Sequence, residues 1–385
     1  MDRYDIVVVG GGIAGASAAW AMAEAADGRT RRVLLLEREA QPGYHATGRS
    51  AALFSETYGN AMVRALSVGS RAFLAAPPAG FTDHEILTPR GAMHVGSVEA
   101  AAVMDELAEA GHRLVPSVRR ISAAEAKTRV PVLRDEAVTG GGVLEPDAQD
   151  IETHGLLAGF LRAFRARGGR VVTDAEVTGL TRDGDGWRLA IRPGTDLGDG
   201  VRADVVVNAA GAWCDVLGEM AGARPVGLVP KRRTALLFDP PAEVDSRFWP
   251  MVIDAQETFY FKPDAGKLLA SPADETPSPP TDAQPEELDI AIAADRVETA
   301  TTLRVGRISH SWAGLRTFAP DKIPVVGFDP GVPGFFWLGG QGGYGFQTCH
   351  ALARIAAALV DRRPVPGDLE DLGITAAALS PGRFG

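Results

Sequence analysis

One stretch near the N-terminus constrains the fold of this chain more than any other. An apolar run from Asp5 leads directly into Gly10-Gly-Gly12-Ile-Ala-Gly15, which has the spacing G-x-G-x-x-G. An amphipathic helix is expected next, followed by a second apolar run from Val33 to Glu37. In this strand–turn–helix–strand context the glycines permit a tight turn, a close approach of backbone to a pyrophosphate and close helix–strand packing. The pattern predicts a dinucleotide-binding βαβ unit.

The acid at the end of the second strand narrows the type of dinucleotide. Glu37 lies 22 residues after Gly15, where a carboxylate can hydrogen-bond the ribose hydroxyls. An acid at this position disfavours a 2′-phosphate and therefore NADP. The motif by itself does not separate NAD from FAD.

Composition excludes several other classes of protein. A chain of 385 residues predicts two or three domains, or two interwoven ones, and its net charge of −10 disfavours nucleic acid and anionic membrane surfaces as partners. Cys214 and Cys349 are the only cysteines, so neither a disulfide framework nor a metal cluster is expected. The first strand begins at residue 4 or 5, which leaves no room for a signal peptide, and no apolar run reaches 18 residues. A cytoplasmic location without a transmembrane segment is the expectation.

The order of the predicted elements indicates interwoven domains. Patterns of alternating strands and helices open the chain and return later, and sheet-rich material interrupts them twice. We therefore expect an α/β fold, with a Rossmann-like dinucleotide domain from residues 1–75, 146–225 and 305–385. An α+β substrate domain with an antiparallel sheet is expected from residues 76–145 and 226–304. Asp150 is predicted to cap a helix that runs to Arg167, and a long helix is predicted from Pro285 to Leu303.

Four stretches rich in glycine and alanine point to the cofactor. They span residues 10–15, 46–52, 209–213 and 339–347. NAD chiefly needs the first of them, whereas FAD, with its isoalloxazine ring, needs several close backbone approaches far apart in sequence. The spacing favours FAD.

Several long runs of sequence resemble one family of flavoproteins. They include residues 37–52, residues 208–215 (Asn-Ala-Ala-Gly-Ala-Trp-Cys-Asp), residues 312–316 (Trp-Ala-Gly-Leu-Arg) and residues 341–345 (Gln-Gly-Gly-Tyr-Gly). These runs are similar to those of the D-amino acid oxidase/glycine oxidase superfamily, and within it to the bacterial D-arginine dehydrogenases. The resemblance covers almost the whole chain and is specific for the family, but not for the substrate.

The resemblance implies a set of cofactor contacts. Ala14, Glu37 and Arg38 would bind the ADP half of FAD, and the Val177 backbone would meet the adenine. The small-residue stretches, including Gly211, would approach the cofactor closely. A loop would line the flavin and the pyrophosphate, and it consists of Ala46, Thr47, Gly48, Arg49, Ser50, Ala51, Ala52 and Leu53. The start of the last long helix would donate backbone amides to the N1–C2=O end of the flavin, from Gly342, Gly343, Tyr344, Gly345, Phe346 and Gln347.

Candidate substrate residues follow from the chemistry of an amino acid carboxylate. Such a group is well held by a bidentate guanidinium, often with a phenol. Arg316 is the best candidate because its surroundings are apolar; Arg233 is a second, and Tyr260 is a partner. The resemblance adds Tyr58 as a further hydroxyl and the Gly343 carbonyl as an acceptor for the substrate amine.

The expected chemistry is flavin-dependent oxidation of the α C–N bond of a D-amino acid. Hydride would pass from the α carbon to flavin N5, and the imino acid would hydrolyse to a 2-oxo acid and ammonia. No general base is needed if the bound amine is already neutral. A quinone, an electron carrier or O2 would reoxidise the flavin.

Two positions depart from the pattern of D-arginine dehydrogenases. Ala92 stands where those enzymes place an acid against a cationic side chain, and Leu53 stands where they place a histidine. An unpaired buried guanidinium typically costs about 3–5 kcal/mol, so weak use of D-arginine and D-lysine is expected. An apolar or neutral side chain would fit Leu53, Ala92 and Met93 better. Three residues could replace the missing acid: Glu56, Glu275 and His94.

Other interpretations stay open at this point. The same fold could act on a 2-hydroxy acid such as 2-hydroxyglutarate, or on an N-substituted glycine. A non-catalytic FAD-binding subunit and an NAD-dependent dehydrogenase are further alternatives. His45, in the cofactor loop, is expected to make a loop hydrogen bond rather than to take part in catalysis.

Overall fold

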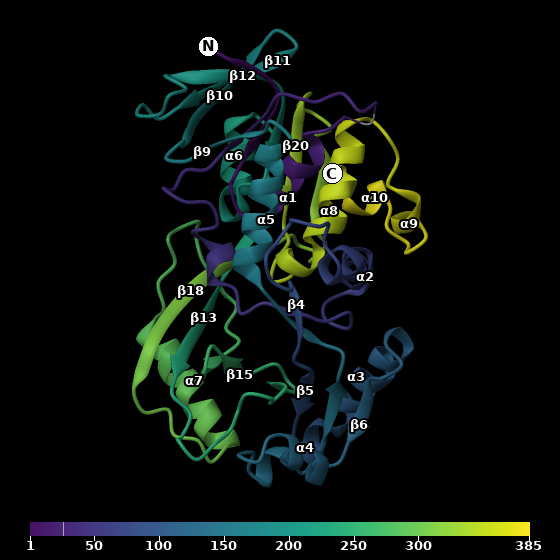
Figure 1. Ribbon diagram of the computed structural model, residues 1–385, viewed down its shortest axis with the longest axis vertical. Helices are drawn as coiled ribbons and strands as arrows, with labels where there is room; N and C mark the ends of the chain where they lie inside the picture. The colour runs from purple at the N-terminus through teal and green to yellow at the C-terminus, as the bar shows by residue number, and fades with distance from the viewer. Residues whose placement is uncertain (26) are drawn as a thin grey trace.

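The computed structural model describes residues 1–25 and 27–385, and its upper half in Figure 1 is built on a mostly parallel sheet. Strand β1 (Arg3–Val9) pairs in parallel with β2 (Val33–Leu36) and with β12 (Gly200–Asn208). The sheet continues through β9 (Arg170–Val172), β10 (Val177–Asp183), β11 (Gly186–Ile191), β19 (Val325–Phe328) and β20 (Phe335–Gly339). β12 also pairs in parallel with β20, so segments far apart in sequence close one sheet.

Alternating side chains of β1 divide the core of this half into two layers. Ile6 and Val8 face a cluster formed with α1 (Ile13–Met22), α2 (Ala61–Ala75), α5 (Thr153–Ala166) and α8 (Gly345–Val360). Val7 faces the other side, where α6 (Cys214–Met220) packs. The two cysteines are buried free thiols. Burial of both sheet faces explains why β2 is wholly apolar and why β1 is apolar from Ile6 to Val9.

A second, nine-stranded sheet forms the lower half of the molecule (Figure 1). Its long strands are β13 (Val229–Phe238) and β18 (Ile308–Phe318), which pair antiparallel, and β17 (Thr276–Pro277) borders β13. It continues through β16 (Lys267–Ser271), β15 (Tyr260–Asp264), β14 (Met251–Asp254), β5 (Ala92–Val95), β7 (Gly142–Glu145) and β6 (Arg119–Ile121). Its helices are α3 (Ala101–Leu114), α4 (Ala123–Arg129) and α7 (Glu287–Ala300).

Short elements complete the chain. A three-stranded sheet joins β3 (Leu53–Phe54), β8 (Gln149–Ile151) and β4 (Leu87–Pro89). The C-terminal segment carries α9 (Gly367–Glu370) and α10 (Ala376–Leu379). In the part of the chain that the structure describes, no helix is long and apolar enough to cross a membrane.

The α/β fold class is confirmed, and three details differ from the sequence analysis. The helix predicted from Asp150 begins at Thr153 and is capped by Glu152, whose carboxylate accepts from the amides of His154 and Gly155. Asp150 instead lies in β8, where ion pairs with Arg90 (2.6 Å) and Lys262 (2.7 Å) hold it. The helix predicted over residues 285–303 is shorter at both ends. Strand β18 lies in the second sheet although the predicted boundary at 304/305 assigned it to the first domain.

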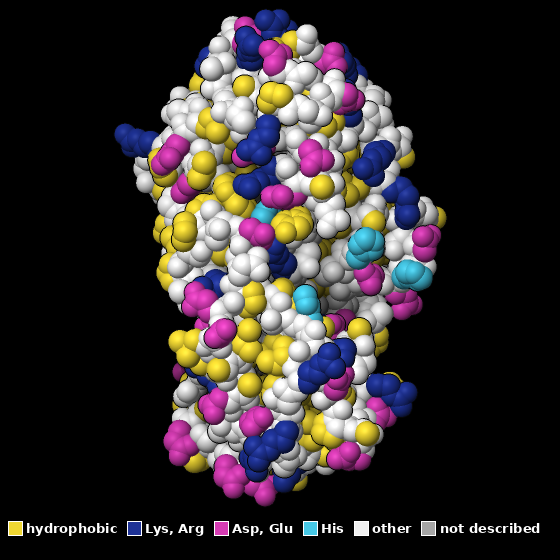
Figure 2. All heavy atoms as spheres, turned by 90° about the vertical axis from the view of Figure 1, so that its left-hand side faces the viewer, with side chains coloured by type: hydrophobic (Ala, Val, Ile, Leu, Met, Phe, Trp, Pro, Cys, Tyr) yellow, Lys and Arg dark blue, Asp and Glu magenta, His cyan; other side chains and the backbone are white. Residues whose placement is uncertain are grey.

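Charges of both signs are interspersed over the face shown in Figure 2, in both halves of the molecule. This face carries no single-sign basic patch of the kind that nucleic-acid binding needs.

Candidate active site

The turn between β1 and α1 is built from glycines that leave no room for side chains. Gly10 has φ +113°, and a Cβ on Gly15 would lie 1.9 Å from the Gly10 carbonyl oxygen. The third glycine of the motif therefore lets α1 approach β1. Thr47 Oγ1 accepts a hydrogen bond from the Ile13 amide (3.0 Å), so the 46–49 loop is held against the first turn of α1.

The acid of the βαβ unit is fixed by backbone amides. Glu37 Oε2 accepts from Gly11 N (2.8 Å), and Oε1 accepts from Glu39 N (2.9 Å). Burial raises the pKa of Glu37, while these two hydrogen bonds act in the opposite direction. The carboxylate borders a pocket of about 210 Å³ at the end of β2.

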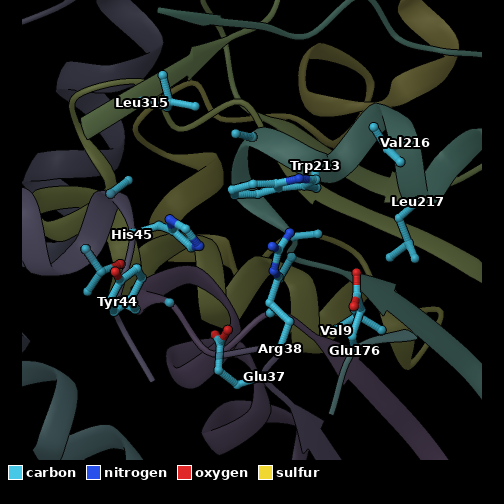
Figure 3. Close-up of a pocket in the computed structure, with 18 of the residues that line it drawn as sticks. Val9, Glu37, Arg38, Tyr44, His45, Glu176, Trp213, Val216, Leu217 and Leu315 are labelled. Carbon is cyan, nitrogen blue, oxygen red and sulfur yellow. The ribbon is translucent and has the colours of Figure 1, made fainter. Parts of the chain in front are cut away.

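Aromatic and basic side chains surround this pocket (Figure 3). The Arg38 guanidinium lies 4.6 Å from the ring centre of Trp213. His45 packs its ring against Trp213 and hydrogen-bonds Glu39 through Nε2 (2.8 Å), which matches the expected loop role. Val177 lines the same pocket. The pocket suits an adenosine moiety because it offers flat stacking surfaces and the carboxylate of Glu37, an acceptor for hydroxyl groups.

A second and larger cavity, of about 740 Å³, continues from the first. Both are lined by Gly12, Ala46, Thr47, Arg49 and Gly211. The second also takes in Ala14, Ser50, Ala51, Ala52, Leu53, Gly342, Gly343, Tyr344, Gly345 and Phe346. Most of the residues predicted to touch the cofactor therefore border one elongated space.

Three predicted contacts lie outside both linings, and each has a structural partner. Gly15 packs on Gly10, and Gly48 N donates to the Gly43 carbonyl (2.6 Å). The Gln347 side chain is buried, with Oε1 accepting from Ser55 N (3.3 Å) and Nε2 donating to Ser67 Oγ (2.8 Å). These residues hold the walls of the cavity in place.

The start of α8 faces the larger cavity, but two of the expected amides are already bonded. Gly342 N donates to Thr317 O (2.8 Å), and Tyr344 N donates to Gln341 O (2.9 Å). The first turn of a helix leaves its amides without intrahelical acceptors. Gly345 and Phe346 open α8 and line the cavity, so they are the amides best placed to meet a ligand there.

Arg316 reaches the cavity from β18 and carries an unpartnered donor. Its Nη2 donates to the Tyr58 hydroxyl (3.0 Å), whereas Nη1 is buried without a hydrogen-bond partner among the described residues. Burial acts to lower the pKa of Arg316, but the phenols of Tyr58, Tyr260 and Tyr344 raise it overall. The guanidinium thus stays charged, and an anion is the group that would satisfy Nη1.

A glycine makes the position of Arg316 possible. A Cβ on Gly343 would lie 1.5 Å from Arg316 Nη2. The guanidinium therefore lies directly against the backbone that precedes α8. This contact joins the candidate carboxylate site to the helix start that borders the same cavity.

Removing the Tyr58 hydroxyl tests the pairing with Arg316. Tyr58→Phe is expected to raise KM for the carboxylate substrate by about two- to tenfold, because a single hydrogen bond contributes about 0.5–1.5 kcal/mol. Tyr4→Phe is a matched control, since Tyr4 is buried outside both cavities and its hydroxyl accepts from Arg170. An unchanged KM in Tyr58→Phe would remove Tyr58 from the site.

The other predicted substrate residues also line the large cavity. Arg233 Nε donates to the Asp274 carbonyl (2.7 Å), and its guanidinium lies 6.0 Å from the ring centre of Tyr260. Glu275 lies within 3.4 Å of Arg233 and 4.0 Å of Arg316. Burial acts to raise the pKa of Glu275, but its hydrogen bond with Lys231 and the nearby guanidinium groups lower it overall. Glu275 is therefore a carboxylate already balanced by cations.

Strand alternation decides which of the predicted specificity residues reach the cavity. Leu53, Ala92 and His94 line it, but Met93 does not. Met93 is fully buried on the opposite face of β5, so its predicted contact with a substrate side chain is wrong. Glu56 forms an ion pair with Arg71 and is not part of the lining. Burial lowers the pKa of His94 to about 4, so this imidazole is neutral near pH 7.

The sequence analysis missed several residues of the cavity wall. Glu145, at the end of β7, is the one with a titratable group buried in the wall. Further ones include Leu107, Ala110 and Gly111 of α3, Met251 and Ile253 of β14, and the cations Arg64 and Lys322. A buried acid at a strand end, followed directly by Pro146, was the available signal for Glu145.

Comparison with known proteins agrees with this geometry. The family described as FAD dependent oxidoreductase (DAO) matches residues 5–359, and the chain belongs to it. A glycine oxidase from Geobacillus kaustophilus is 25% identical over 97% of both chains, and an L-2-hydroxyglutarate dehydrogenase from Escherichia coli is 28% identical over 58% of this chain and 51% of its own. An L-proline dehydrogenase from P. horikoshii has the same fold, with a TM-score of 0.82 at 20% identity over 100% of this chain and 98% of that one.

The cofactor of this family fits the residues present. FAD is long, and the two joined cavities form one space from Glu37 to Arg316. Glycines line or close that space where a Cβ would meet another atom: a Cβ on Gly12 would lie 3.0 Å from Thr47 Oγ1. The helix starts of α1 and α8 both border it, and helix N-termini favour negative charge. Glu37, the 46–53 loop and the first turn of α8 would hold the cofactor.

Proposed function

We propose that this protein oxidises the α C–N bond of a D-amino acid with a neutral or apolar side chain, giving an imino acid that hydrolyses to a 2-oxo acid and ammonia. The observation that carries the proposal is Arg316, which lines the cavity assigned to the flavin and whose buried Nη1 lacks a hydrogen-bond partner among the described residues, with Glu275 4.0 Å away. When bound, FAD supplies the hydride acceptor, its N5.

The side chains of the cavity have distinct tasks in this proposal. Arg316 and Tyr58 bind the substrate carboxylate and so set the position of the α carbon. The Gly343 carbonyl accepts a hydrogen bond from the amine. Arg233 and Tyr260 support the carboxylate end, and Leu53 and Ala92 supply apolar walls for the side chain. His94 is half-buried and its pKa is lowered to about 4, so the imidazole is neutral near pH 7 and the proposal assigns no proton transfer to it.

Anaerobic titration of the purified protein with matched D- and L-amino acids tests the proposal. D-amino acids with neutral side chains should bleach the flavin band near about 450 nm, and their L-enantiomers should not. D-arginine as the best substrate would contradict the expected side-chain preference. A flavin that no amino acid reduces would contradict the proposed function itself.

A 2-hydroxy acid is the second candidate substrate, and cations in the cavity favour it. Arg64 and Lys322 line the same space, and Arg64 Nε is buried without a partner in the described part of the chain. They could meet a second carboxylate, as a 2-hydroxyglutarate-like substrate would require. N-substituted glycines are a third class because they share the carboxylate and the amine. The same titration, extended to both classes, identifies the compound that reduces the flavin fastest.

A further inference from the structure

Glu145 lies directly across from Ala92 in the second sheet. β5 and β7 are antiparallel, with Ala92 paired to Glu145 and His94 paired to Val143. Residues directly opposite in such a pair point to the same face, with Cβ atoms about 4.5–5.5 Å apart. All four of these residues line the large cavity, whereas Met93 and Leu144 face the core on the other side. Glu145 therefore places an acid beside Ala92, at a part of the cavity where Ala92 itself offers no polar group.

The carboxyl group of Glu145 is buried, hydrogen-bonded and free of any cation. Its Oε2 accepts from Ser55 Oγ (2.8 Å) and Thr57 Oγ1 (2.6 Å). The residue is 5% exposed, and no cationic side chain in the described ranges lies within ion-pair distance of it. Burial raises the pKa of Glu145, and the two hydroxyl bonds act against that effect. Such a group is costly to bury in an otherwise apolar wall unless its acceptor capacity is used.

Holding the loop does not account for this acid. The hydroxyls of Ser55 and Thr57 also lie 3.1 Å from each other, so they can hydrogen-bond without it. A carboxyl group offers about four acceptor positions, and the two hydroxyls occupy two of them. The neighbouring parts of the wall carry apolar side chains or a glycine. They are formed by Leu107, Ala110, Gly111, Val118 and Val143.

We propose that Glu145 is a specificity-determining residue that accepts a hydrogen bond from a donor group at the end of the substrate's side chain. This inference rests on the proposed function, because it needs the substrate carboxylate at Arg316. It narrows the expected substrate from a D-amino acid with any neutral or apolar side chain to one whose neutral side chain ends in a hydrogen-bond donor, such as an amide. Burial raises the pKa of Glu145 and so favours its neutral form, which can accept from a neutral donor but does not balance the charge of an ammonium.

Non-oxidisable carboxylates test the inference through binding alone. Succinamate and 4-methylpentanoate have the same shape and differ in an amide against an isopropyl end; glutaramate and 5-methylhexanoate are one methylene longer. Dissociation constants for the FAD-loaded protein come from calorimetry and from the flavin difference spectrum. In at least one pair the amide should bind about tenfold more tightly, the upper range for one neutral hydrogen bond. 6-Aminohexanoate, which ends in an ammonium group, tests whether a cationic donor binds more tightly than the amides.

Variants of two acids in the same cavity locate the effect. In Glu145→Met the amide preference should fall to within about twofold, and Glu145→Gln should keep part of it because its carbonyl still accepts. Glu257→Met is the matched control, since Glu257 lines the cavity but is exposed, and it should keep the full preference. FAD content and the midpoint of thermal unfolding confirm that each variant is folded.

The outcomes separate this inference from the proposed function. An alkyl preference in the wild type, or an amide preference that survives in folded Glu145→Met, would overturn the role of Glu145. Tighter binding of 6-aminohexanoate than of both amides would overturn the neutral donor. Reduction by D-amino acids would still stand in either case. Carboxylates that bind equally well to wild type and Arg316→Gln would overturn both proposals.

Discussion

Arg316→Gln should lower kcat/KM for the amino acid substrate by about 10²- to 10⁴-fold while the purified protein keeps its FAD. The estimate follows from the cost of losing one partner of a buried charge pair, about 3–5 kcal/mol. Arg316 lines the cavity, and its Nη1 has no hydrogen-bond partner in the described structure and only a 4.0 Å contact with Glu275, so a substrate carboxylate would provide its main partner. Steady-state kinetics and rapid-reaction reduction of the flavin would measure the loss in KM and in the reductive step separately.

A second arginine serves as the control for this variant. Arg296 lies on α7 outside the cavity lining, and its guanidinium donates to the Pro272 carbonyl (2.8 Å) and to that of Thr258. Arg296→Gln should reduce stability without changing KM. Arg316→Lys should recover only part of the activity, because an ammonium does not reproduce the two-pronged contact of a guanidinium. Full activity in Arg316→Gln would show that the carboxylate binds elsewhere, with Arg233 as the next residue to replace.

Local patterns were sufficient to predict the dinucleotide unit. Gly10, Gly15 and Glu37 act within one βαβ unit, and the role of each depends on neighbours in the same short stretch of chain. The family-like run ending at Arg316 likewise places its guanidinium in the cavity. Such features can be predicted from sequence because the regular repeat of a strand or a helix fixes the direction of each side chain.

The side-chain end of the cavity depends on pairings between distant strands. Ala92 and Glu145 are 53 positions apart, and only the register between β5 and β7 brings them together. The period of two within β5 was enough to separate Ala92 from Met93, so that error was avoidable. The bond from Gly342 N to the Thr317 carbonyl is again a tertiary contact. Asp150 resembles a helix cap locally, but its two cationic partners lie 60 and 112 positions away in the chain.

Gly15→Ala should weaken FAD binding by about 10²-fold without preventing the chain from folding. The new Cβ would lie 1.9 Å from the Gly10 carbonyl oxygen and 3.3 Å from Ala209 Cβ, and neither atom belongs to a flexible side chain that could yield. Either α1 moves away from β1 or the turn opens, and both changes displace the helix start that faces the pyrophosphate. Overpacking of this kind costs about 1–3 kcal/mol or more, so we expect the dissociation constant for FAD to rise by about 10²-fold.

Fluorescence titration of the apoprotein with FAD measures this dissociation constant, and the flavin content after purification gives an independent check. Gly306→Ala is the matched control, because a Cβ at Gly306 would meet nothing within 4 Å. It should bind FAD as the wild type does. A Gly15→Ala protein that retains one tightly bound FAD per chain would show that α1 can shift without loss of the site. In that case the close approach of α1 to β1 serves packing, and the affinity for the cofactor resides in the 46–53 loop and in α8.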